Sequence, residues 1–128
     1  MYPRVLVVEE QPALRERYAE FLHDEGYDVV TTSAVDEVLS LARKLEPRVV
    51  VLDPDAGSGR GMQAALDLLE LNLSLYLVFN TSHPFSMETD FSTWVADAYA
   101  VRSHGVRELS QTLRHLLAKE QALSAPGA

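Results

Sequence analysis

Short apolar runs, separated by charged or turn-forming residues, recur along most of this chain. Two of them, Val5–Val8 and Val49–Leu52, are rich in β-branched residues and show no polar alternation, which is typical of strands buried on both faces. Weaker runs predict further strands at Asp28–Thr32, Leu75–Asn80 and Ala98–Val101. The pattern therefore predicts five strands.

Between these runs the apolar residues recur every three to four positions, as they do on one face of a helix. The first such segment is Pro12–Glu25, which has proline at its first helical position. Others lie between Ser33 and Pro47, around residues 62–69, and from Val106 to about Leu117. Strands that alternate with helices in this way predict an open parallel sheet with helices on both faces.

Two parts of the chain have a weaker pattern. Pro84–Val95 is rich in serine, threonine and aspartate, which are poor helix formers, so a helix there would depend on packing by Phe91 and Trp94. We expect this segment to be mobile. The pattern predicts one domain over residues 1–120 and a flexible tail or the start of a linker at 121–128.

Composition and charge narrow the classes of function. The chain has no cysteine, which excludes disulfides, thiolate metal sites and cysteine nucleophiles. Its formal net charge of −8 repels nucleic-acid phosphates and anionic lipids, so we expect no direct binding to nucleic acid or membrane. The first apolar run is too short for a signal sequence or a membrane span, and we expect a cytoplasmic protein.

Charged and polar residues follow the predicted strands. In a parallel sheet with helices on both faces, ligands bind outside the carboxyl ends of the strands. The residues found there are Glu9, Glu10, Asp53, Thr81 and Arg102. Carboxylates on neighbouring strands repel each other unless a hard cation lies among them, and oxygen ligands suit Mg²⁺. The alternative is that these residues form a solvated rim of the sheet that binds no ligand.

These residues resemble the receiver domain of two-component response regulators, over Arg4 to about Leu117. The acid pair Glu9-Glu10 follows the first strand, Asp53 stands at the phosphoacceptor position, and Gly61 lies eight residues later, where that family has glycine. Phe-Asn-Thr-Ser at residues 79–82 matches the switch threonine, and Ala-Asp-Ala-Tyr-Ala-Val-Arg at 96–102 matches the aromatic and lysine region. The resemblance implies a flavodoxin-like (βα)5 fold.

The resemblance also implies a function and a set of site residues. Asp53 would accept a phosphoryl group from a histidine kinase or phosphotransfer protein, with Thr81 and Arg102 contacting the phosphate and Thr81 and Tyr99 acting as the switch. Mg²⁺ would be held by Glu9, Glu10, Asp53 and the backbone carbonyl of Asp55. The module would not be an enzyme; it would signal to a downstream effector protein, and the resemblance leaves room for a homodimer.

Three departures from the family pattern keep a second interpretation open. The family usually has aspartate where Glu10 stands, lysine followed by proline where Arg102 and Ser103 stand, and Met-Pro at residues 56–57. Glu10 is one methylene longer, and the guanidinium of Arg102 is bulkier than an ammonium. The alternative is a degenerate receiver that binds a partner without being phosphorylated.

One motif also resembles that of an enzyme family. Asp53-Pro54-Asp55 matches the Asp-x-Asp of haloacid-dehalogenase-type phosphatases, but that family places the motif after its first strand. For a signalling module, the surface expected to change and to meet a partner is Pro84–Val101, which includes Trp94 and Tyr99.

Overall fold

The computed structural model describes residues 2–82 and 96–124 of the chain. Five strands form one parallel sheet in the order β2-β1-β3-β4-β5. Their bounds are β1 Arg4–Val8, β2 Asp28–Thr32, β3 Val49–Leu52, β4 Tyr76–Thr81 and β5 Ala98–Val101. The predicted α/β fold with a five-stranded parallel sheet is confirmed.

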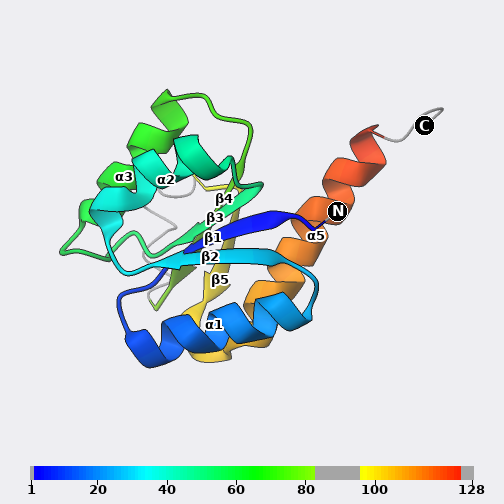
Figure 1. Cartoon of the computed structure of the whole chain (residues 1–128), viewed down its shortest axis with the longest axis horizontal. Helices are drawn as coiled ribbons and strands as arrows, with labels where there is room; N and C mark the ends of the chain where they lie inside the picture. Colours follow the sequence, from blue (N-terminus) through cyan, green and yellow to red (C-terminus); the bar gives the residue numbers. More distant parts are fainter. Residues whose placement is uncertain (1, 83–95, 125–128) are drawn as a thin grey trace.

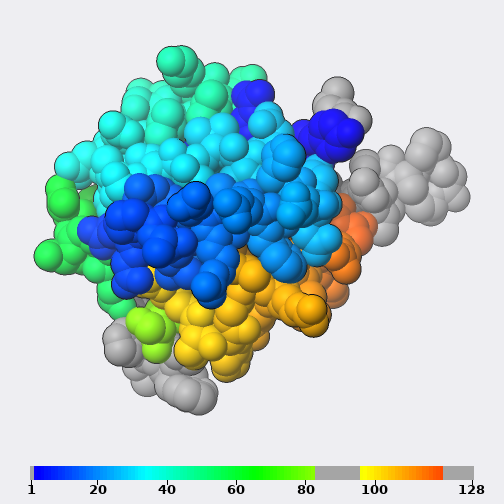
Figure 2. All heavy atoms as spheres, turned by 60° about the horizontal axis from the view of Figure 1, so that its bottom comes forward, coloured from blue at the N-terminus to red at the C-terminus, as the bar shows by residue number. Residues whose placement is uncertain are grey.

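Helices cover both faces of this sheet, as Figure 1 shows. The α-helices among the described residues are α1 Pro12–Asp24, α2 Val38–Leu45, α3 Arg60–Glu70 and α5 Val106–Ser124. Helices α2 and α3 lie on one face, and α1 and α5 lie on the other. Figure 2 shows α1 and α5 side by side across their face of the molecule.

The core consists of two apolar layers, one on each side of the sheet. Leu6, Val50 and Phe79 point to the layer under α2 and α3, and all three are fully buried. Their neighbours along the strands, such as Val5 and Val51, point to the layer under α1 and α5. Burial on both faces explains why β1 and β3 read as continuous apolar runs rather than as alternating ones.

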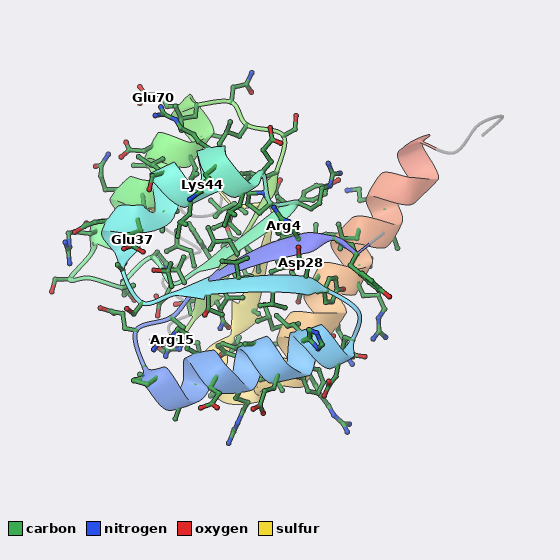
Figure 3. All side chains as sticks on the ribbon, viewed as in Figure 1. Arg4, Arg15, Asp28, Glu37, Lys44 and Glu70 are labelled. Atoms are coloured by element: carbon green, nitrogen blue, oxygen red, sulfur yellow. The ribbon has the colours of Figure 1, made fainter. Side chains whose placement is uncertain are left out.

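An ion pair joins the two strands at one edge of the sheet. Arg4 stands opposite Asp28 in the register of β1 and β2, and its Nε donates to Asp28 Oδ2 at 2.8 Å (Figure 3). Arg4 also donates from Nη1 to the carbonyl of Leu45, where α2 ends, at 2.9 Å. The pair is half exposed, so it contributes little to stability, and the site chemistry lies at the other end of the strands.

Some element boundaries differ from the prediction. Helix α2 is preceded by a 3₁₀ turn, η1 Val35–Glu37, in which Glu37 accepts a hydrogen bond from the Thr32 hydroxyl at 2.9 Å. Helix α5 continues to Ser124, beyond the last periodic leucine and into the segment expected to be a tail. The Pro84–Val95 segment lies outside the described residues. Within those residues, none of the helices has the length and apolar character needed to cross a membrane.

Candidate functional site

The carboxyl edge of the sheet brings together residues from strands that are far apart in sequence. Glu9 directly follows β1 and Asp53 directly follows β3, and these strands are neighbours in the sheet. Thr81 is the last residue of β4, and Arg102 begins the 3₁₀ turn η3, Arg102–His104, after β5. Glu9, Asp53 and Thr81 are buried.

Arg102 binds both buried carboxylates at once. Its Nη1 donates to Asp53 Oδ2 at 2.9 Å, and its Nη2 donates to Glu9 Oε2 at 3.0 Å. To make these contacts from the end of β5, the side chain reaches past β4 to residues of β3 and β1. We call Glu9, Asp53 and Arg102 the carboxylate site.

The charges of the carboxylate site stabilise the arginine as a cation. Burial is the largest single effect on the guanidinium and would lower the pKa of Arg102. The charge of Glu9, followed by the hydrogen bond and charge of Asp53, outweighs burial and raises that pKa above its ordinary value. Arg102 is therefore a permanent positive charge between two acids.

A buried tyrosine and asparagine lie beside this site. Asn80, from β4, donates from Nδ2 to the hydroxyl of Tyr18 on α1 at 2.8 Å, and both residues are buried. Burial is the main cause that raises the pKa of Tyr18, while the hydrogen bond from Asn80 and the nearby charge of Arg102 act against it. The pair connects α1 with β4 close to Arg102.

Other contacts fix the loops around the carboxylate site. Asp53 Oδ1 accepts the backbone N–H of Asp55 at 2.8 Å, whereas the Asp55 side chain is exposed. Glu10 is also exposed, and its Oε1 accepts the backbone N–H of Gly57 at 3.2 Å. Arg15, in the first turn of α1, donates to the carbonyl of Glu9 at 3.0 Å (Figure 3). The acid pair thus splits, with one carboxylate in the site and one at its rim.

The two predicted switch residues lie on neighbouring strands. Thr81 stands opposite Val101 in the register of β4 and β5, one residue before Arg102. Tyr99 is half-buried, and its ring meets that of Phe79 edge to face, with centroids 5.9 Å apart. Burial raises the pKa of the Tyr99 phenol. Their roles as a switch stay predictions.

The four predicted metal ligands do not gather into a metal site in this arrangement. Within residues 2–82 and 96–124, no three acidic or histidine side chains are placed to hold one ion. Glu9 and Asp53 each give an oxygen to Arg102, and the carbonyl of Asp55 accepts the Gly59 N–H at 3.3 Å. The donor set as it stands does not fit the octahedron of oxygens that Mg²⁺ requires.

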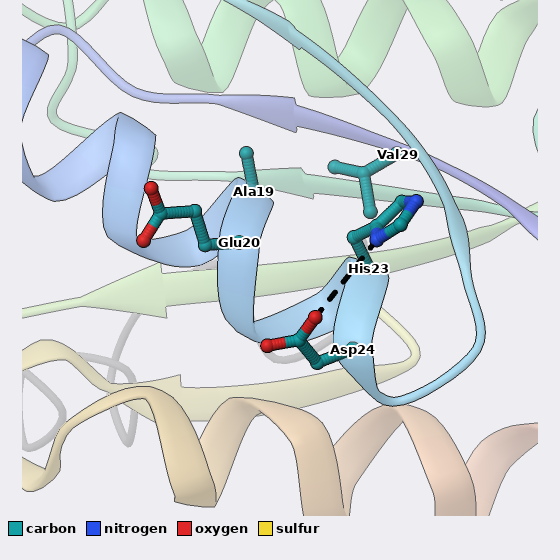
Figure 4. A pocket seen from close by; sticks show the side chains of 5 residues that line it. All are labelled: Ala19, Glu20, His23, Asp24 and Val29. Carbon is teal, nitrogen blue, oxygen red and sulfur yellow. Dashed lines mark ion pairs between the residues drawn. The ribbon is translucent and has the colours of Figure 1, made fainter.

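A surface hollow lies at the other end of α1. It is lined by residues of α1 and β2, among them Glu20, His23 and Asp24, as Figure 4 shows. His23 Nδ1 and Asp24 Oδ1 are 4.0 Å apart, and both side chains are largely exposed. Exposed groups at this separation are screened by solvent, so the hollow offers no organised chemistry.

Glu108, in the first turn of α5, fixes the backbone next to Arg102. Its Oε2 accepts the N–H of Val101 at 2.7 Å, and its Oε1 lies 3.0 Å from Nδ1 of His104. The hydrogen bond with His104 is the largest effect on the carboxyl and lowers the pKa of Glu108; burial opposes it, and the Val101 amide lowers it further. The ionised carboxylate thus holds the end of β5 against α5.

Glu108→Gln is expected to lower the free energy of unfolding by about 1 kcal/mol at neutral pH, because a charged acceptor is lost. A carboxyl whose pKa is lowered in the folded state adds stability above its unfolded pKa and loses it as the pH falls through the folded value. The difference between the variant and the native chain should therefore shrink as the pH falls below 4.5, the ordinary value for this group. Urea unfolding at several pH values measures it, with Glu16→Gln, an exposed acid on α1, as the control. Equal and pH-independent losses in both variants would contradict the assignment.

The sequence and fold place this chain in a known family. A family model of the response regulator receiver domain matches residues 5–101. The chain therefore belongs to the response regulator receiver domain family, whose members are signalling modules of two-component systems. The phosphatase alternative finds no support, since Asp53 follows β3 rather than the first strand.

Two regulators illustrate the similarity in sequence. The transcriptional regulatory protein TrcR of Mycobacterium tuberculosis is 30% identical over 124 residues, which is 96% of this chain and 48% of TrcR. The transcription regulator BvgA of Bordetella pertussis is 32% identical over 89 residues, which is 68% of this chain and 42% of BvgA. The chain spans about half the length of the curated relatives it matches.

Solved structures agree with the fold. A CheY-like receiver domain from Methanospirillum hungatei superimposes with a TM-score of 0.85 over 97% of this chain and 100% of its own, at 18% identity, which supports the fold alone. The response regulator TrrA, solved in complex with the histidine kinase ThkA, has a TM-score of 0.79 and 29% identity, over 90% of this chain and 98% of its own. TrrA of Thermotoga maritima has also been solved with Mg²⁺ and BeF, at 28% identity, a TM-score of 0.79, and coverage of 89% of this chain and 98% of its own.

The sequence did not predict every part of the site. It placed Glu9, Asp53, Thr81 and Arg102 at one edge, where the structure has them. It missed the Tyr18–Asn80 pair. The sequence features that could have revealed the pair are an asparagine inside an apolar strand and a tyrosine on the core face of a helix. A buried polar group needs a hydrogen-bond partner, so each could have been expected to have one.

Proposed function

We propose that this receiver domain accepts a phosphoryl group on Asp53 from the phosphohistidine of a histidine kinase or a phosphotransfer protein. The observation that carries the proposal is how Asp53 is held. Its Oδ1 accepts the Asp55 amide and its Oδ2 accepts Arg102, so the carboxylate is fixed in one orientation at the edge where parallel sheets bind ligands. TrrA, which is solved with a histidine kinase, supports the class of donor.

In the proposed reaction one Asp53 carboxylate oxygen attacks the phosphorus in line, and the bond from phosphorus to the imidazole nitrogen of the donor breaks. The electron pair of that bond leaves with the imidazole, which departs as neutral histidine when its other ring nitrogen carries a proton. Arg102 is then free to pair with phosphoryl oxygens instead of the carboxylate, since a guanidinium binds either acceptor with two donors. Thr81, at the end of the neighbouring strand, would donate its hydroxyl to the same group.

The proposal includes how the signal leaves the domain. Thr81 and Tyr99 form the switch, and the Pro84–Val101 surface meets a downstream effector protein. Most of that surface lies outside the described residues, so it stays a prediction from the sequence. The same holds for a homodimer, for a cytoplasmic location, and for the absence of nucleic-acid binding and of an enzymatic activity of its own. Mg²⁺ at Glu9, Glu10, Asp53 and the Asp55 carbonyl also stays a prediction.

The test is phosphorylation of the purified chain by acetyl phosphate, measured by intact mass. The native chain should gain the mass of one phosphoryl group, and Asp53→Asn should gain none. Asp55→Asn, which removes an equal charge from the exposed acid two residues away, is the matched control and should still be labelled. A native chain that gains no mass with any donor, or an Asp53→Asn variant labelled like the native chain, would show that the proposal is wrong.

A further inference from the structure

The carboxylate site already contains a cation, and that cation is part of the chain. Arg102 donates one N–H group to each of Glu9 and Asp53, at 3.0 and 2.9 Å. The side chains of the two acids are 5% and 10% exposed, and that of Arg102 is 20% exposed. Buried carboxylates are costly unless a positive charge is paired with them, and the guanidinium meets that need for both.

The geometry of the pair of contacts depends on arginine. A guanidinium is planar and presents its N–H groups as a fixed fork, so two nitrogens can point to two different carboxylates. A lysine ammonium at the same position would present its three N–H donors from one nitrogen at the end of a shorter side chain. Arg102 instead contacts Glu9 and Asp53 from two separate nitrogens.

Three carboxylate oxygens at this edge also accept backbone N–H groups. Glu9 Oε2 accepts the Gln11 N–H at 3.1 Å as well as Arg102. Asp53 Oδ1 accepts the Asp55 N–H, and Glu10 Oε1 accepts the Gly57 N–H. A divalent ion that bound the other lone pairs of these carboxylates would stand a few ångströms from the charge of Arg102, which is unfavourable in a partly buried site.

We propose that Arg102 is the resident cation of the carboxylate site and that Mg²⁺ binds Glu9 and Asp53 only in competition with it. This inference rests on the proposed function for its choice of site. It adds a regulation to that site: the acids are neutralised without metal, and Mg²⁺ must bind against the charge of Arg102, which contacts both carboxylates. Removal of the guanidinium should then convert the site into one that binds Mg²⁺.

The experiment is calorimetric titration of MgCl₂ into the full chain at constant ionic strength, without a phosphoryl donor. Arg102→Gln should bind Mg²⁺ about tenfold or more tightly than the native chain, because a positive charge in contact with both ligands is removed. Arg102→Lys, which keeps the charge on a shorter side chain with one donor nitrogen, should lie between the two. Arg114, on α5, forms an exposed pair with Glu25. Arg114→Gln removes an equal charge there and should bind Mg²⁺ as the native chain does.

Thermal unfolding supplies a second readout. Mg²⁺ should raise the midpoint of Arg102→Gln and leave that of the native chain almost unchanged at the same concentration. If Arg102→Gln does not fold, Arg102→Lys and the native chain carry the comparison. Equal Mg²⁺ affinity in the native chain and the Arg102 variants, or no binding by any of them, would overturn the inference. Phosphorylation of Asp53 is measured separately by mass, so either proposal can fail while the other stands.

Discussion

Gly61→Ala is expected to lower the free energy of unfolding by about 4 kcal/mol or more, close to the limit of what a single substitution costs. Gly61 is the second residue of α3 and is buried against the loop that follows β3. A Cβ atom at this position would lie 2.2 Å from the backbone carbonyl oxygen of Asp53 and 3.0 Å from that of Pro54. Because both are backbone atoms, the clash can be relieved only by moving the helix or the segment that carries Asp53.

The loss is measured by urea unfolding, with Gly26→Ala as the control. Gly26 has a φ of +100° but no atom within 4 Å of the position of its Cβ, so alanine there meets backbone strain alone. That strain costs about 1–2 kcal/mol. A larger loss at position 61, where φ is not positive, isolates the close contact with Asp53. Equal losses of unfolding free energy at the two positions would show that α3 and the Asp53 loop move apart at little cost.

Arg102→Gln is expected to lower the free energy of unfolding by about 3 kcal/mol in the presence of a metal chelator, because it leaves two buried carboxylates facing each other without a cation. Glutamine keeps much of the length and some hydrogen-bonding capacity of arginine, so most of the loss reports the missing charge. Chemical unfolding of the native chain and the variant under identical conditions gives the difference directly.

Arg114→Gln provides the comparison for this measurement. The Arg114 side chain is 66% exposed, and its Nη2 lies 3.1 Å from Oε1 of Glu25. An exposed pair of this kind contributes about 1 kcal/mol or less. If the two variants lose the same small amount of unfolding free energy, the contacts of Arg102 contribute no more than a surface ion pair does. The stability of the carboxylate site would then not depend on its arginine.

Much of the fold follows from the local apolar pattern. The strands Asp28–Thr32, Val49–Leu52 and Ala98–Val101 were predicted with the bounds that the structure has. Val49–Leu52 lies between Arg48 and Asp53, and Ala98–Val101 lies between Asp97 and Arg102, so charged residues mark both ends of these two runs. Helix α5 was predicted too short, because Ala118–Ala122 contains good helix formers but no apolar period that marks a buried face.

The residues of the site were predictable, but their contacts were not. Acids and a base at the ends of parallel strands meet at one edge whatever the details, and this placed Asp53 and Arg102 together. The sequence could not show that Arg102 passes β4 and reaches Glu9, since that depends on side-chain geometry across four strands. For the same reason, the replacement of the family lysine by Arg102 was expected to alter the contact with phosphate. The structure shows instead that Arg102 contacts the two carboxylates.

The reach of Arg102 has a consequence for how this protein folds. Its contact with Glu9 closes a separation of 93 residues, and it comes from the strand that is added last along the chain. Contacts this distant in sequence form late and slow the search for the native state. Until β5 is in place, Glu9 and Asp53 lie on adjacent strands with no positive partner from this residue. During synthesis, the first four strands would therefore form a sheet that is weakened at its carboxyl edge, and the segment that contains β5 and Arg102 would complete the sheet and neutralise the site in the same step.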